Sequence, residues 1–65
     1  SVRVDEMDSF YRWMYDNLEL WSKTQSGQDK AILTIRDAIV NHTLVADAEI
    51  NLAACLCELT TIEEE

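Results

Sequence analysis

The sequence predicts an all-α protein: a small bundle of three short helices, completed by association with further copies. Three observations lead to this fold class. The 65 residues contain no proline and a single glycine, so helix breakers are nearly absent. Apolar residues recur every three or four positions, which is the period of a helix face and not of a strand. A chain of this length also buries too little surface to be more than marginally stable alone.

The first predicted helix covers 5–23. Asp5 is its expected N-cap, and Lys23 lies near its end, where a positive charge favours the helix dipole. All five aromatic residues of the chain, two Trp, two Tyr and one Phe, fall inside this segment. Its main apolar stripe consists of Met7, Phe10, Met14, Leu18 and Trp21.

The second predicted helix covers 27–41 and the third covers 44–62. Ser26 and Asp29 resemble a capping box at the start of the second helix, and Thr43 or Asp47 is the expected N-cap of the third. The apolar stripes of these two segments are out of phase, which favours a turn over one continuous helix. The third helix shows a seam made of Val45, Ala48, Leu52, Cys55, Leu59 and Ile62.

We expect residues 1–65 to form one domain, with residues 1–4 as an N-terminal tail and residues 63–65 as an acidic, solvated C-terminal tail. No apolar run approaches the roughly 18 residues of a membrane span, so no membrane partner is expected. Two cysteines without a disulfide framework favour a reducing, cytoplasmic location.

Apolar residues also occupy a second side of each predicted helix. A helix at the surface of a small monomer should bury one stripe and expose polar residues elsewhere. The surplus therefore indicates a homo-oligomer, most simply a dimer, or another protein that covers these faces. The alternative is that Trp13 and Leu20 belong to the edge of an ordinary core. The residues expected at such an interface are Trp13, Leu20, Leu33, Val40 and Leu44.

The charge of the chain is strongly one-sided. The net charge is −8, and residues 37–65 contain seven carboxylates but no Lys or Arg. This distribution repels phosphate and so argues against direct nucleic-acid binding, whereas it attracts a basic protein surface. The predicted acidic surface consists of Asp37, Asp47, Glu49 and Glu58.

No motif in the sequence points to catalysis, a metal or a cofactor. Cys55 and Cys57 lie two positions apart on a helix, so their side chains diverge by about 160° and cannot share a metal. His42 has no nucleophile close to it in the sequence. The chain is therefore predicted to be no enzyme but a small acidic module that binds another protein. The alternative is an acidic mimic of nucleic acid that occupies the basic groove of a DNA- or RNA-binding protein.

Overall fold

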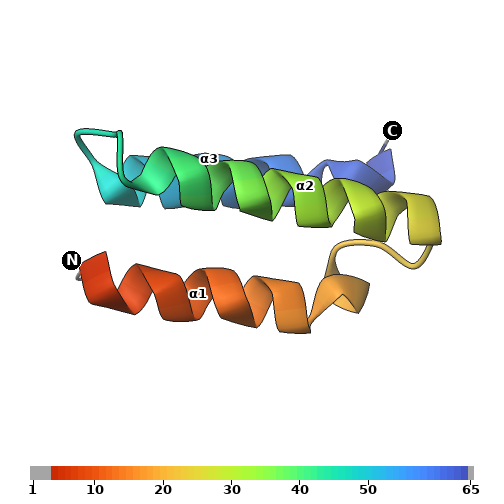
Figure 1. The fold of residues 1–65 in the computed structure, drawn as a ribbon. Coiled ribbons are helices and arrows are strands. Elements are labelled where there is room, and N and C mark those ends of the chain that lie inside the picture. The colour runs from red at the N-terminus through yellow and green to blue at the C-terminus, as the bar shows by residue number, and fades with distance from the viewer. Residues whose placement is uncertain (1–3, 65) are drawn as a thin grey trace.

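A computed structural model describes residues 4–64 and confirms the predicted all-α bundle of three short helices. Three helices, α1 (Val4–Asp16), α2 (Gln25–His42) and α3 (Ala48–Thr60), form a small bundle, and within residues 4–64 there is no strand. Two short 3₁₀ turns, η1 (Leu18–Leu20) and η2 (Ile62–Glu64), follow α1 and α3. Figure 1 shows α1 running antiparallel to α2, with α3 behind α2. α3 packs mainly against α2 and also touches α1.

The first helix is shorter than the sequence predicts. It ends at Asp16 because Asn17 leaves the helical conformation, with φ −126° and ψ 44°. The side-chain amide of Asn17 donates to the carbonyl of Trp13 over 2.8 Å, and the indole N–H of Trp21 donates to the carbonyl of Met14 over 3.0 Å. These side chains satisfy carbonyls that a longer helix would satisfy with its own backbone. The expected continuation to residue 23 is therefore wrong.

At the other end, α1 already includes Val4, which the sequence assigned to the N-terminal tail. Asp5 lies within the first helical turn and is not the N-cap; its side chain and residues 1–3 are outside the described part. The predicted start differs from the observed one because the sequence offers several acidic residues that suit the first turn of a helix equally well.

α2 begins at Gln25, two residues before its predicted start, and its N-cap is Thr24 instead of Ser26. The Thr24 hydroxyl accepts a hydrogen bond from the N–H of Gly27 at 3.0 Å and lies 3.1 Å from the hydroxyl of Ser22. A Cβ atom at position 27 would collide with the side chain of Ser22, which is buried. Glycine is therefore required here for the close approach of the loop to the helix.

The predicted turn between the second and third helices is confirmed. α2 ends at His42, and α3 starts at Ala48, four residues later than the sequence predicts. Asp47 is the N-cap, and its carboxylate accepts hydrogen bonds from the N–H groups of Glu49 (2.9 Å) and Ile50 (3.4 Å). Val45 was expected in the seam of the third helix, but it precedes the cap and is exposed in the turn.

The core lies along the line where the three helices meet. Phe10 was expected in this core, but its side chain is 43% exposed, because the buried stripe of α1 is narrower than the apolar arc in the sequence. The buried apolar residues are Met7, Tyr11 and Met14 of α1, Ala31, Ile35 and Ala38 of α2, and Cys55 and Leu59 of α3.

The described part of the acidic C-terminal segment is attached to the rest of the bundle. A carboxylate oxygen of Glu63 in η2 accepts a hydrogen bond from the backbone N–H of Lys23 at 3.0 Å. Hydrogen bonding from the Ser22 side chain and from the Lys23 N–H lowers the pKa of the Glu63 carboxyl. This hydrogen bond connects η2 to the loop between η1 and α2.

Candidate functional site

Two apolar hollows on the described surface of the bundle involve α1. The first is the aromatic face, which we define as Phe10 and Trp13 together with Glu6 and Ser9. These four residues line a shallow hollow of about 480 Å³. Trp13 is 49% exposed and Phe10 is 43% exposed, so this face presents two large aromatic side chains to solvent. Exposed apolar clusters of this kind are typical of binding surfaces.

Trp13 is held in place by a second tryptophan. The rings of Trp13 and Trp21 meet edge to face, with centroids 6.1 Å apart and planes inclined by 80°. Trp21 is itself fixed, because its indole N–H donates to the carbonyl of Met14 at the end of α1. The end of α1 at Asp16 makes this possible, since the chain turns back through η1 and brings Trp21 under Trp13.

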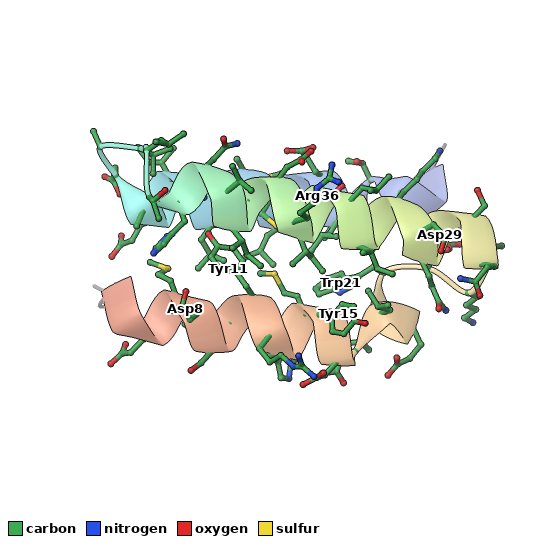
Figure 2. All side chains as sticks on the ribbon, viewed as in Figure 1. Asp8, Tyr11, Tyr15, Trp21, Asp29 and Arg36 are labelled. Carbon is green, nitrogen blue, oxygen red and sulfur yellow. The ribbon has the colours of Figure 1, made fainter. Side chains whose placement is uncertain are left out.

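The second surface is the α1–α2 groove, an apolar channel of about 470 Å³ between the two antiparallel helices. Tyr11 and Ile35 are buried beneath it, and Arg12 and Arg36 stand on opposite sides of it. Figure 2 shows Asp8 and Tyr15 on α1 and Tyr11 between the helices, whereas the Arg36 side chain extends from α2 away from α1. The remaining lining residues are Ile32, Ile39 and Val40, so that α3 contributes no residue.

Each of these two arginines pairs with an aspartate on its own helix. Arg12 Nε lies 3.1 Å from a carboxylate oxygen of Asp16, and its guanidinium lies 5.3 Å from the centre of the Tyr15 ring. Arg36 Nη2 lies 3.2 Å from a carboxylate oxygen of Asp37. All four side chains are more than half exposed, so these pairs contribute at most about 1 kcal/mol each to stability.

The structure does not gather the five predicted interface residues on one surface. Trp13 belongs to the aromatic face and Val40 to the α1–α2 groove, whereas Leu33 lines a separate hollow between α2 and α3. Leu20 is in η1 and Leu44 is in the turn after α2. All five are exposed, by 49% to 77%.

The sequence argument placed Trp13 beside Leu20 on one continuous helix, and that helix ends between them. It missed Phe10 as the neighbour of Trp13, although two aromatics three positions apart on a helix share a face and were a usable signal.

The four predicted acidic residues occupy different settings. Asp37 pairs with Arg36, and Asp47 caps α3. Glu49 lies in the first turn of α3, and Glu58 lies near its end, in the hollow that also contains Lys30. Glu49 and Glu58 therefore give α3 its negative charge, with no basic residue on the helix itself.

The residues with potential reactivity are separated from one another. Among the described residues, no three of His, Cys, Asp or Glu are grouped so that they would hold a metal ion. Cys55 is buried, and burial raises the pKa of its thiol to about 11, whereas Cys57 is exposed. His42 packs edge-on against Tyr11 at 5.8 Å, and its buried Nδ1 has no hydrogen-bond partner in the described part of the chain.

Between Val4 and Glu64, no helix combines the length and apolar character needed to cross a membrane. Comparison with known proteins gives no relative: no family model, curated protein or solved structure matches this chain. The fold, the net charge and the exposed side chains therefore place this chain in a broad structural class: small acidic three-helix proteins with exposed apolar faces.

Proposed function

We propose that this protein is a helical interaction module that binds another protein through the aromatic face of α1. The observation that carries the proposal is the position of Trp13, half-exposed on the helix surface and held edge to face against the anchored Trp21. Tryptophan is the side chain most enriched among residues that dominate binding energy. Trp13 forms an exposed aromatic cluster with Phe10, and such clusters are typical of binding surfaces.

The aromatic face is organised before a partner arrives. Trp21 restricts the ring of Trp13 from one side, and the backbone of α1 fixes the distance between Trp13 and Phe10. A partner that inserts an apolar side chain into the hollow beside them therefore loses little conformational entropy on the side of this protein. The small polar Ser9 and the carboxylate of Glu6 form its edge.

We further propose that the partner presents an apolar anchor residue flanked by basic side chains. The net charge of −8 raises the local concentration of basic surfaces and repels acidic ones. Charge would thus set the rate and selectivity of encounter, while contact with Trp13 and Phe10 would supply most of the affinity.

The experiment compares three versions of the protein: wild type, Trp13→Ser and Tyr15→Ser. Tyr15 is the matched control because it is an exposed aromatic residue on the same helix, but it faces the α1–α2 groove. A partner captured by wild type is purified, and its dissociation constant is measured with each version. We expect Trp13→Ser to weaken binding about 30-fold or more and Tyr15→Ser to leave it unchanged.

Equal affinity of wild type and Trp13→Ser would rule out the aromatic face. If that result came with binding that disappears as salt is raised, it would support the alternative function, an acidic mimic that occupies a basic groove. The feature that supports this acidic-mimic alternative is the lack of Lys and Arg after Arg36.

A further inference from the structure

The residues that line the α1–α2 groove include two of the five basic residues of the chain, and each of these arginines is paired at the surface with an aspartate of its own helix. The net charge is −8, yet Arg12 and Arg36 both border this one groove, on opposite sides of its apolar floor. Only one carboxylate, Asp8, is among the residues that line it. A helix that fits this groove should therefore present an apolar stripe with acidic residues on both of its flanks.

The outer face of α3 has this pattern. We define it as Ile50, Ala53, Ala54 and Cys57, four exposed residues at positions i, i+3, i+4 and i+7. At about 100° per residue they fall within an arc of about 100°, with Glu49 beside one edge and Glu58 beside the other. Ile50 is 68% exposed, and nothing in the described bundle covers it.

We propose that the α1–α2 groove of one copy receives the outer face of α3 of a second copy. Ile50 and the small side chains around it would pack between Tyr15, Ile39 and Val40. The glutamates on the flanks of α3 would face Arg12 and Arg36 of the other copy and replace their exposed pairs with Asp16 and Asp37.

The lengths of the two surfaces agree. The outer face of α3 spans seven residue steps, or about 10 Å at the rise of an α-helix. The groove runs from Ile32 to Val40 on α2, eight steps or about 12 Å. The small residues at 53, 54 and 57 permit a close approach, and Ile50 supplies the one large apolar side chain of this surface.

This contact joins two different surfaces, so it is heterologous. α3 lines no part of the groove, and in Figure 1 it lies on the far side of α2. A copy that donates its α3 therefore keeps its own groove open for a third copy, and the assembly grows into an open chain or closes as a ring.

The first test uses the natural thiol of Cys57, which is exposed in the outer face of α3. An Ile39→Cys variant places a second thiol at one end of the groove, and an Ile32→Cys variant places it at the other end. Mild oxidation should link Cys57 of one copy to the groove of the next. We expect at least one of the two variants to give a ladder of two, three and more linked copies on a non-reducing gel.

Three controls define this result. Wild type can link only through Cys57 pairs and should stop at two copies. Each groove variant combined with Cys57→Ser should also stop at two copies. A Leu44→Cys variant, with its thiol in the exposed turn outside the groove, should give no ladder. Absence of a ladder from both groove variants, or an equal ladder from Leu44→Cys, would overturn the proposal.

The second test exchanges charges between the two surfaces. Arg12→Glu/Arg36→Glu makes the groove acidic, and Glu49→Lys/Glu58→Lys makes the flanks of α3 basic. Each double variant alone should raise the concentration needed for assembly about tenfold or more, because like charges then meet. An equal mixture should restore assembly with alternating copies, since each groove again meets a complementary helix.

Solution mass across a dilution series at about 0.15 M salt provides the readout, and circular dichroism confirms that every variant is folded. Wild type that stays monomeric at all concentrations, or a mixture that fails to recover, would overturn the proposal. Tyr15→Ser should weaken assembly and spare the partner, whereas Trp13→Ser should do the reverse, so the two surfaces are tested independently.

Discussion

Asn51 of α3 donates a hydrogen bond from its side-chain amide to the hydroxyl of Tyr11 on α1, over 3.1 Å. The same amide nitrogen donates to the carbonyl of Ala38 on α2, over 2.9 Å. One polar side chain thus connects all three helices at their meeting line. Tyr11 is almost fully buried, so its hydroxyl requires a partner inside the protein, and Asn51 provides it.

Removing the hydroxyl should weaken this connection. We expect Tyr11→Phe to lower the free energy of unfolding by about 1 kcal/mol, because Asn51 loses one acceptor but keeps Ala38. Urea denaturation followed by circular dichroism measures this change. Tyr15→Phe is the matched control: the Tyr15 ring is exposed, and the same loss of a hydroxyl should leave stability nearly unchanged. An equal effect of the two substitutions would contradict the role assigned to the Tyr11 hydroxyl.

The cap of α3 gives a second prediction. Asp47→Ala should cost about 1 kcal/mol, because two backbone N–H groups at the start of α3 lose their acceptor. Thr43→Ala should cost less, since the Thr43 hydroxyl only donates to the carbonyl of Val40 at the end of α2. Thermal unfolding of both variants decides between the two caps that the sequence offered. A larger loss for Thr43→Ala would show that the turn is capped differently.

Stability should fall in alkaline solution. Burial raises the pKa of the Cys55 thiol from 9.0 to about 11, and burial is also the largest cause of the raised pKa of Tyr11. The folded state holds these protons more tightly than the unfolded chain does. The stability that this difference confers is complete below about pH 9 and is lost as the pH rises toward 11.

Urea titrations at successive pH values measure the slope of this loss. Cys55→Ala should show a shallower decline between about pH 9 and pH 10 than wild type, because only wild type has a buried thiol to ionise there. Cys57→Ala is the control, because it removes an exposed cysteine instead of the buried one. Identical slopes for all three proteins would mean that Cys55 does not titrate differently on folding.

The two cysteines should differ in reactivity. A thiol reagent at neutral pH should modify Cys57 rapidly in the native protein and Cys55 only after unfolding, because Cys55 is buried and its raised pKa suppresses the thiolate. Mass spectrometry of the labelled protein distinguishes one modified residue from two. Rapid double labelling without denaturant would contradict the buried position of Cys55.

Sequence reasoning succeeded where a local signal acts alone. The absence of proline and the three- and four-residue spacing of apolar positions were enough to predict three helices and a turn near residue 43. Asp47 was recognised as one of two candidate caps for the same reason, since capping depends on a few adjacent residues. Boundaries were less accurate, because several neighbouring side chains can each begin or end a helix.

The end of α1 at Asp16 could not be predicted from the local apolar pattern, because it depends on tertiary contacts. Residues 17–21 have a helical apolar pattern, but tertiary packing uses Trp21 differently: its ring lies against Trp13 and its N–H bonds to Met14. The position of Trp13 in the aromatic face depends on this contact with Trp21, which forms because the chain turns back through η1. Phe10 and Trp21 both carried the pattern of the core stripe, and only the packed bundle shows that Phe10 is exposed whereas Trp21 is partly buried.

By itself, the sequence determined the helical class, the number of helices and the surplus of apolar and acidic surface, because these follow from composition and periodicity. Only the tertiary structure decided which apolar side chains are covered, which arginines flank a common groove and which polar atoms connect the helices. Those relationships join residues far apart in the chain, such as Tyr11 and Asn51, and depend on how the helices are rotated against one another. Helical periodicity fixes the faces of each helix, but not which faces meet.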